Sequence, residues 1–251
     1  MIEVIFLSIV QGITEFIPVS SSAHLILISK YFNFNNENLT LDVSLHLGSL
    51  LAIILYFRKE LLDFIDNKQL FFKILLSSIP VMVFGFLLIQ LNLIDYLRNT
   101  KIIGWSTVIF GLLLYFSDRV KIKNNINHDF KYSTAFYIGL FQILSLIPGV
   151  SRSGITMTGA RFFNFNRVDS AKISFLLSIP TLSAASLYTL QKLVSENNFE
   201  VSFLNFLAIT LSFFFSYIAI KFFLNFLKKF SLTSFVIYRF ILGSLILIYA
   251  Y

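Results

Sequence analysis

The chain has 251 residues, of which 57% are hydrophobic and only 13% are charged, and its formal net charge is +7. A soluble domain carries about a quarter charged residues, so this composition excludes an ordinary soluble protein, and the absence of cysteine excludes disulfides, thiolate metal sites and cysteine nucleophiles. Long apolar runs without regular polar–apolar alternation predict a polytopic helical membrane protein and not a β-barrel.

The first predicted element, residues 1–32, is a hairpin of two short helices. It lacks the basic start and the cleavage site of a signal peptide, so we expect it to belong to the mature structure. Pro18 interrupts the apolar run, and the second limb, 23–32, has ten residues. At the helical rise per residue that limb is about 15 Å long, half of a bilayer core. The stretch therefore predicts a re-entrant hairpin.

Six longer apolar segments are predicted to cross the membrane, because each is close to the ~20 residues that span its hydrocarbon core. They are 41–57, 72–93, 102–117, 170–190, 203–225 and 233–251.

Lysine and arginine are distributed unevenly among the connecting segments. Segments 58–73 and 118–131 carry four each and 161–172 and 221–230 carry three each, whereas 33–40 has none, 94–101 has two and 191–200 has one. The positive-inside rule places the first group in the cytoplasm and the N-terminus outside. Since 118–131 and 161–172 then share one side, the stretch 129–160 is predicted to be a second re-entrant hairpin, broken at Pro148-Gly149.

The two halves of the chain resemble each other. "FIPVSSSA" (16–23) is similar to "LIPGVSRSG" (146–154), and the two hairpins are predicted to enter from opposite sides. We predict one all-α membrane domain, 1–251, with six transmembrane helices and two re-entrant hairpins in an inverted repeat. Repeat 1 covers about 1–117, including hairpin 1–32, and repeat 2 covers about 129–251, including hairpin 129–160. Broken helices at matching positions of such halves are typical of a midplane binding site.

Glu15 is the one acidic residue well inside an apolar segment. Placing a charge there costs about 2.5–3.5 kcal/mol, so Glu15 needs a partner. Arg152, the basic residue at the second break, is the natural candidate. The alternative is that the two form an ion pair that only locks the hairpins together.

Hydroxyl side chains cluster at both breaks: Ser20, Ser21 and Ser22 at the first, and Ser151, Ser153 and Thr156 at the second. Single serines in membrane helices are often packing residues. Two clusters at helix starts, where backbone N–H groups are unpaired, instead favour a phosphate site, to which Arg152 adds a bidentate fork.

Three further polar residues of the apolar segments have candidate roles. His24 follows the first serine cluster and is a candidate acid or base, although it could also be a hydrogen-bonded structural residue. Gln11 lies one helical turn before Glu15, and their oxygens could hold Mg²⁺ or Ca²⁺ if substrate phosphates complete the site. We interpret His46 as a packing residue.

Arg239 lies inside the last predicted span. We expect its long side chain to extend towards the cytoplasmic end of that helix, where the guanidinium would reach water.

Two motifs identify the family that the chain resembles. "QGITEFIPVSSSAHL" (11–25) and "PGVSRSGIT" (148–156) resemble the two signatures of the bacterial undecaprenyl-diphosphate phosphatases of the bacitracin-resistance type. The similarity extends to "LDVSLHLGSLLAIILYFR" (41–58) and "FLLSIPTLSAAS" (175–186), so it covers essentially the whole chain.

The resemblance implies hydrolysis of undecaprenyl diphosphate to undecaprenyl phosphate and phosphate, which recycles the cell-wall lipid carrier and confers bacitracin resistance. It implies an inverted-repeat fold in the bacterial inner membrane, with the site towards the external face. The family's acidic pair corresponds to Gln11 and Glu15, and its nucleophile to Ser21. Undecaprenyl diphosphate and membrane lipid are the expected partners, without nucleic acid, and a homodimer is left open.

The predicted site thus has two groups of residues. The catalytic residues are Glu15, Ser21, His24 and Arg152, with Glu15 also the metal ligand, and the substrate-binding residues are Gln11, Ser20, Ser22, Ser151, Ser153 and Thr156. Two alternatives stay open: direct attack by water in place of Ser21, and a polyprenyl-phosphate flippase or small-molecule transporter that uses the same cavity without chemistry. A scaffold protein would leave Glu15 and Arg152 unexplained.

Overall fold

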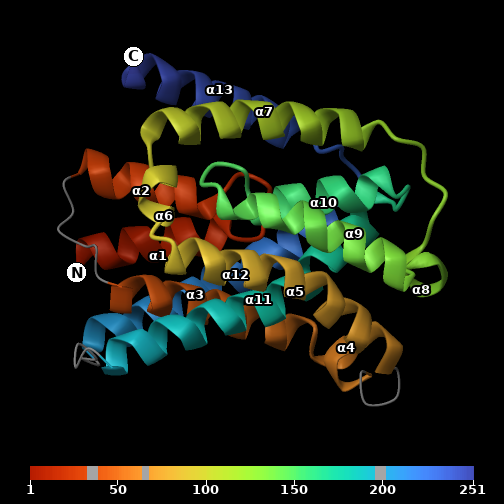
Figure 1. Cartoon of the computed structure of the whole chain (residues 1–251), viewed down its shortest axis with the longest axis horizontal. Coiled ribbons are helices and arrows are strands. Elements are labelled where there is room, and N and C mark those ends of the chain that lie inside the picture. Colours follow the sequence, from red (N-terminus) through yellow and green to blue (C-terminus); the bar gives the residue numbers. More distant parts are fainter. Residues whose placement is uncertain (33–38, 64–67, 196–201) are drawn as a thin grey trace.

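The computed structural model describes residues 1–32, 39–63, 68–195 and 202–251 (Figure 1). Its helices are, in chain order, α1 (Ile2–Thr14), α2 (Ser21–Tyr31), α3 (Leu39–Tyr56), α4 (Arg58–Leu62), α5 (Lys68–Gln90), α6 (Ile94–Leu97), α7 (Thr100–Asp118), α8 (Ile126–Asp129), α9 (Tyr132–Ile143), the 3-10 turn η1 (Leu144–Leu146), α10 (Arg152–Phe162), α11 (Arg167–Ser195), α12 (Phe203–Leu227) and α13 (Thr233–Ala250). These ranges contain no strand beyond one isolated bridge between Asn124 and Phe165. The all-helical prediction is confirmed for them.

Five of the described helices, α5, α7, α11, α12 and α13, are long and apolar enough to cross a membrane. The sixth predicted span falls in α3, whose apolar described part, Thr40–Tyr56, is shorter. Outward-facing side chains such as Phe86 and Phe214 are exposed and apolar, as suits contact with lipid. The chain is therefore a multi-pass integral membrane protein.

Two helices break at the positions that the sequence predicts. Between α1 and α2 the chain turns at Pro18, whose ring fixes φ and removes a backbone donor. Between η1 and α10 it turns at Gly149, whose φ of +94° favours glycine. A Cβ atom on Gly149 would also lie 2.6 Å from the Ile103 carbonyl oxygen, so α7 passes too close to this turn for any side chain.

The packing of the longer helices surrounds these breaks. α7 lies beside α13, α12 beside both α1 and α3, and α9 beside α5 (Figure 1). Phe16, at the first break, packs edge-to-face on Phe175 of α11 with ring centroids 5.3 Å apart, and Phe175 in turn contacts Phe57 and Phe223. Because all four rings are buried, they fix the backbone next to Glu15.

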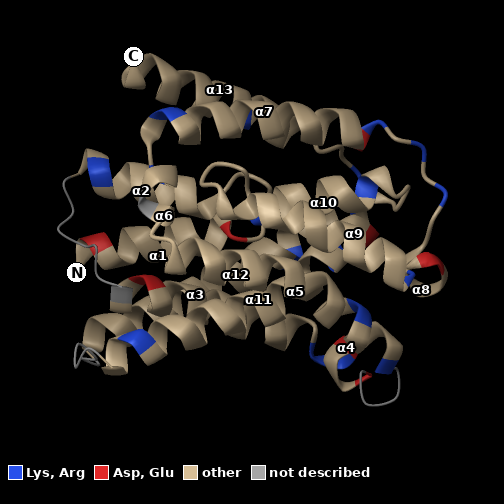
Figure 2. Ribbon diagram, in the orientation of Figure 1, with Lys and Arg blue, Asp and Glu red and all other residues tan. Residues whose placement is uncertain are grey.

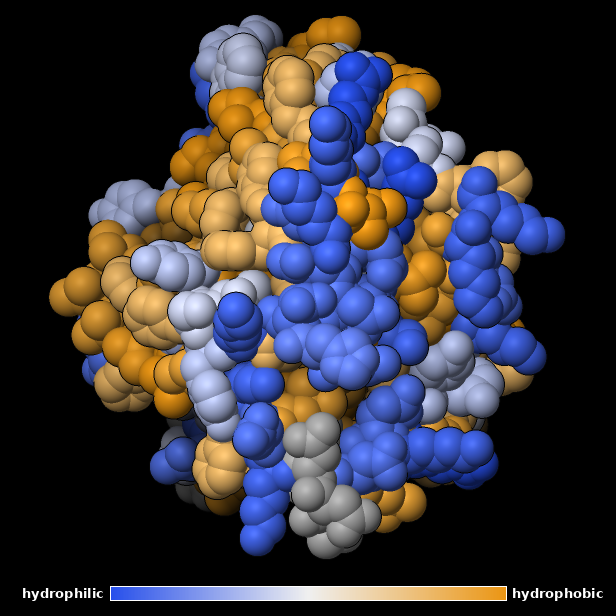
Figure 3. Space-filling model, turned by 90° about the vertical axis from the view of Figure 1, so that its right-hand side faces the viewer, coloured by the Kyte–Doolittle hydropathy of each residue, from blue (hydrophilic) through white to orange (hydrophobic). Residues whose placement is uncertain are grey.

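Most basic residues lie at the end of the bundle that holds α4 and α8 (Figure 2). Viewed from that end, hydrophilic residues form a broad band between apolar flanks (Figure 3). This agrees with grouping 58–73, 118–131 and 161–172 on one side. The loops expected at 33–40 and 191–200 lie partly outside the described residues.

A buried charge cluster joins the helices at this basic end. Asp118 accepts hydrogen bonds from Arg167 Nε and Nη2 at 2.6 and 3.1 Å and from the Leu232 N–H at 3.1 Å. Arg161, which is 1% exposed, donates to the carbonyl oxygens of Asp118, Val120 and Phe165. Arg161 thus ties the segment after α7 to the end of α10, and Asp118 ties the end of α7 to the starts of α11 and α13.

Candidate active site

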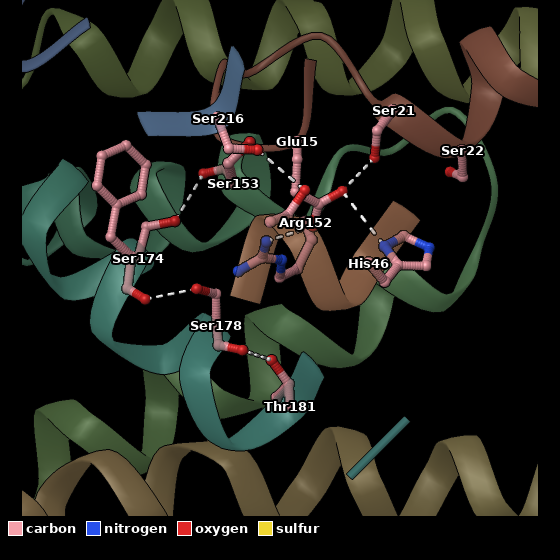
Figure 4. A network of polar contacts seen from close by, with 12 residues as sticks. Glu15, Ser21, Ser22, His46, Arg152, Ser153, Ser174, Ser178, Thr181 and Ser216 are labelled. Atoms are coloured by element: carbon pink, nitrogen blue, oxygen red, sulfur yellow. Dashed lines mark hydrogen bonds and ion pairs between the residues drawn. The ribbon is translucent and has the colours of Figure 1, made fainter. Parts of the chain in front are cut away.

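Glu15 and Arg152 meet between the two helix breaks. Arg152 Nη2 lies 2.5 Å from Glu15 Oε1, and the side chains are only 14% and 5% exposed (Figure 4). Glu15 directly follows α1, and Arg152 is the first residue of α10. The structure therefore brings together the two charges that the sequence singled out, 137 positions apart.

The second oxygen of Glu15 has different partners. Ser21 donates its hydroxyl hydrogen to Oε2 at 2.5 Å, and Gln11 Nε2 donates to the same atom at 3.0 Å. Oε1 of the carboxylate thus binds the Arg152 guanidinium, and Oε2 binds the Ser21 hydroxyl. Such an arrangement aims the proton of Ser21 at a buried base, which is the geometry of an activated nucleophile.

Each of the two helices that start at the site has an unusual serine cap. Ser20 before α2 and Ser151 before α10 have φ values of 73° and 72°, a region that costs a non-glycine residue energy. Their hydroxyls accept from the backbone N–H of Ala23 and Gly154, at 3.4 and 3.1 Å. The two breaks therefore share one backbone feature, an N-cap serine at positive φ.

This shared feature gives Ser21 and Arg152 equivalent positions, since each is the first helical residue after its cap. The residue after each also matches: Ser22 Oγ lies 3.3 Å from its capping serine and Ser153 Oγ lies 3.2 Å from its own. Equivalent positions in two different helices thus approach one carboxylate, Glu15, from two directions.

The predicted phosphate-binding hydroxyls of α10 are occupied by the protein. Ser153 donates to the Ile17 carbonyl at 3.0 Å, and Thr156 bonds to the Arg152 carbonyl at 2.8 Å and lies 2.6 Å from Ser174 Oγ. Both are buried. These bonds hold the second break against the first, and direct contact of Ser153 and Thr156 with substrate stays a prediction.

Two polar atoms at the site have no partner within the described part of the chain. They are Arg152 Nη1 and Gln11 Oε1, and both are buried. A buried donor or acceptor left unpaired costs about 1–3 kcal/mol, which a bound ligand would recover. Ser22 is exposed and the His46 side chain is 34% exposed, so the network opens on the side of these residues.

Comparison with known proteins identifies the family. The sequence model of the family described as bacitracin resistance protein BacA matches residues 4–245. The chain belongs to the BacA family. An undecaprenyl-diphosphatase of Pelagibacter ubique is 52% identical over 252 residues, covering 100% of this chain and 98% of that protein. Those of Saccharophagus degradans and Roseobacter denitrificans are 39% and 36% identical, covering 97% and 100% of this chain and 96% and 99% of theirs.

In this BacA-family chain, His24 has other partners than Glu15. Its Nδ1 donates to the Ser20 carbonyl at 2.7 Å, and its Nε2 lies 2.5 Å from the hydroxyl of Tyr238 on α13. The two rings are stacked, with centroids 5.8 Å apart. These contacts fasten α2 to α13, which is the structural alternative considered for this residue. A catalytic role of His24 stays a prediction.

His46 of α3 is the residue that the sequence interpretation missed. It was expected to be a packing residue, but its Nδ1 lies 2.9 Å from Gln11 Nε2 and 3.9 Å from Glu15 Oε2. The available signal was an imidazole inside an apolar segment, which marks a functional position by default. Which of two such histidines faces Glu15 depends on how α2 and α3 are rotated.

The donor set suits a divalent cation only in part. Glu15 supplies one carboxylate and Gln11 one buried, unpartnered amide oxygen. The described residues contain no group of three or more His, Asp or Glu that could hold a metal. Hard cations such as Mg²⁺ bind through one or two carboxylates together with substrate phosphates. The residues therefore fit a cation that arrives with its substrate.

The position of the Arg239 side chain on α13 differs from the one that the sequence predicts. Its side chain does not extend to the membrane edge, because the residue is 0% exposed and its guanidinium bonds to backbone carbonyls at both helix breaks. Those bonds satisfy the guanidinium in the interior, so reaching water offers it no advantage.

Proposed function

We propose that this chain hydrolyses undecaprenyl diphosphate to undecaprenyl phosphate and phosphate, recycling the lipid carrier of cell-wall synthesis and conferring bacitracin resistance. One observation carries the proposal: a buried carboxylate receives a serine hydroxyl on one oxygen and a guanidinium on the other. Membership of the BacA family and similarity to three undecaprenyl-diphosphatases support the choice of substrate.

Arg152 binds the diphosphate in the proposed mechanism. Its unpartnered Nη1 is available for a phosphate oxygen while Nη2 stays on Glu15. The N-terminal N–H groups of α2 and α10, which start at the site, favour the same anion. A guanidinium at this position also stabilises charge on the transferring phosphoryl group, and such stabilisation, together with positioning, accounts for most of the catalysis of phosphoryl transfer.

Ser21 is the nucleophile. Its proton passes to Glu15, Oγ forms a bond to the terminal phosphorus, and the bridging P–O bond breaks to release undecaprenyl phosphate. Water then attacks the phosphoserine, Oγ leaves and recovers its proton from Glu15, and phosphate departs with both protons of the water. Gln11, bonded to Glu15 Oε2, and His46, bonded to Gln11, keep that oxygen turned towards Ser21.

A divalent cation, Mg²⁺ or Ca²⁺, would be held by oxygens of Glu15 and Gln11 together with the substrate's phosphates, where it would offset their negative charge. The prenyl tail remains in the lipid beside the helices, as the apolar outer surface allows.

The proposed topology is an inverted repeat of six transmembrane helices and two re-entrant hairpins, with repeat 1 about 1–117 and repeat 2 about 129–251. The two strained caps support it, and so does the packing. α1 lies against α12 as α9 lies against α5, and α3 lies against α12 as α11 lies against α5. The basic end faces the cytoplasm of a bacterial inner membrane, and the site opens to the external face.

The test is phosphate release from undecaprenyl diphosphate by the purified protein in detergent with Mg²⁺ or Ca²⁺. Wild type should release phosphate, and Glu15→Gln and Ser21→Ala should each lose at least about 100-fold in kcat. Asp118→Asn, at an equally buried carboxylate of the basic end, is the matched control and should retain kcat. Rapid quenching should trap phosphate on Ser21 of wild type.

Two outcomes would contradict the proposal. Substrate binding by wild type without phosphate release would leave the transporter alternative. Phosphate release without a trapped phosphoserine, and with kcat retained in Ser21→Ala, would replace the serine by a directly attacking water.

A further inference from the structure

Arg239 is a buried cation that the proposed chemistry does not use. It lies within α13, is 0% exposed, and forms no ion pair with any described residue. A lone charge at this depth of a membrane protein is costly and marks a function by default. Its partners indicate what that function is.

Its hydrogen-bond partners among the described residues are all backbone carbonyls, and three of them belong to the two breaks. Nη1 donates to the carbonyls of Pro18 and Val150 at 3.4 and 2.9 Å, and Nη2 donates to that of Gly149 at 2.9 Å. Nε donates to the Thr107 carbonyl of α7 at 3.2 Å. One guanidinium thus holds the first break, the second break and α7 together.

The neighbouring helix α7 leaves space for the Arg239 side chain. A Cβ atom on Gly111 of α7 would lie 3.2 Å from the Arg239 Cβ and 3.4 Å from its Nε. The turn carbonyls themselves need donors, because Pro18, Gly149 and Val150 are buried between helices and have no helical partner for their carbonyl oxygens. Arg239 supplies them where water would otherwise have to enter.

We infer that Arg239 is a positioning residue, whose guanidinium fixes the distance between the two turns and so holds Ser21 and Arg152 on opposite oxygens of Glu15. Pro18 lies three residues before Ser21, and Val150 lies two residues before Arg152. A shift of either turn therefore moves one of the two groups that must meet the same phosphoryl group. The inference rests on the proposed phosphatase function.

A lysine could not replace this arginine. Its ammonium keeps the charge but is a single point with three donors, and it cannot span carbonyls that lie on both sides of a planar fork. Arg239→Lys therefore tests geometry at constant charge. Arg161→Lys is the matched control, since Arg161 is 1% exposed and donates to three backbone carbonyls, one fewer than Arg239, but at the basic end.

The experiment measures kcat, KM and thermal unfolding of both variants in detergent, with undecaprenyl diphosphate as substrate. Arg239→Lys should lose about 100-fold in kcat, the effect of misplacing reacting groups by about 1 Å, with KM changed by less than about threefold because Arg239 does not contact the phosphates. Arg161→Lys should lower the unfolding temperature while kcat of the folded protein stays within about threefold.

A double variant identifies the route of the effect. If Arg239 acts by placing Arg152, then adding Arg239→Lys to Arg152→Lys should reduce kcat by much less than it does in wild type, since neighbours in one network are not additive. Wild-type kcat in Arg239→Lys, equal kcat losses in Arg239→Lys and Arg161→Lys, or additive losses in the double variant would each overturn the inference. An inactive wild type would instead overturn the proposed function.

Discussion

Replacing both members of the Glu15–Arg152 ion pair should have opposite consequences for stability, which should largely recover, and for activity, which should not. At a separation of 2.5 Å and an effective dielectric constant of about 20, the gross attraction is about 7 kcal/mol before desolvation. Removing one partner of such a buried pair leaves an uncompensated charge and costs about 3–5 kcal/mol, whereas replacing both by uncharged side chains of similar volume is often neutral.

We therefore expect Glu15→Gln and Arg152→Met each to destabilise the folded protein by about 3 kcal/mol. The double variant should recover most of that loss, because no unpaired charge remains. It should still release no phosphate, since neither base nor phosphate clamp is left. Denaturant titration of the protein in detergent measures the unfolding free energy, and phosphate release measures the activity.

The pair formed by Asp118 and Arg167 provides the control. It is also buried on the carboxylate side and bidentate, with bonds of 2.6 and 3.1 Å, but it lies at the basic end. Asp118→Asn with Arg167→Met should retain kcat, because neither residue lies at the site. Additive destabilisation by Glu15→Gln and Arg152→Met, or an active double variant, would refute the reasoning.

Three further predictions concern single residues or the cation. Gly149→Ala should lower the unfolding free energy by at least about 2 kcal/mol, because alanine is strained at positive φ and its Cβ would meet α7. The control is Gly85→Ala, where the added Cβ would have its nearest neighbour at 3.4 Å, and it should leave the unfolding free energy unchanged. Thermal unfolding measures the stability of both variants. A chelator should abolish phosphate release and Mg²⁺ or Ca²⁺ should restore it; full activity in the chelator would exclude the cation. Gln142→Leu should leave the unfolding temperature unchanged or raise it, because both polar atoms of this fully buried amide lack partners within the described residues.

The sequence predicts the breaks and the central ion pair because each has a local signal. A proline inside an apolar run breaks a helix whatever surrounds it, and a carboxylate at that depth requires a cation. For the histidines and Arg239 the local signal marks a buried polar residue but does not identify its partner. Whether His24 or His46 faces Glu15 depends on helix rotation, and the place of Arg239 depends on carbonyls of two turns that are distant in sequence.

The proposed repeat explains why the protein has one site although it has two nearly identical breaks. Ser21 and Arg152 follow matching caps, yet the proposed mechanism makes one the nucleophile and the other the phosphate clamp. Three residues before Pro148 the second hairpin has Ser145, where the first hairpin has Glu15 three residues before Pro18. A hydroxyl in that place provides no second carboxylate, whose charge would repel a diphosphate and compete for Arg152. In the proposed mechanism each half therefore contributes a different part of the reaction, and the chemistry is confined to the surface where the halves meet.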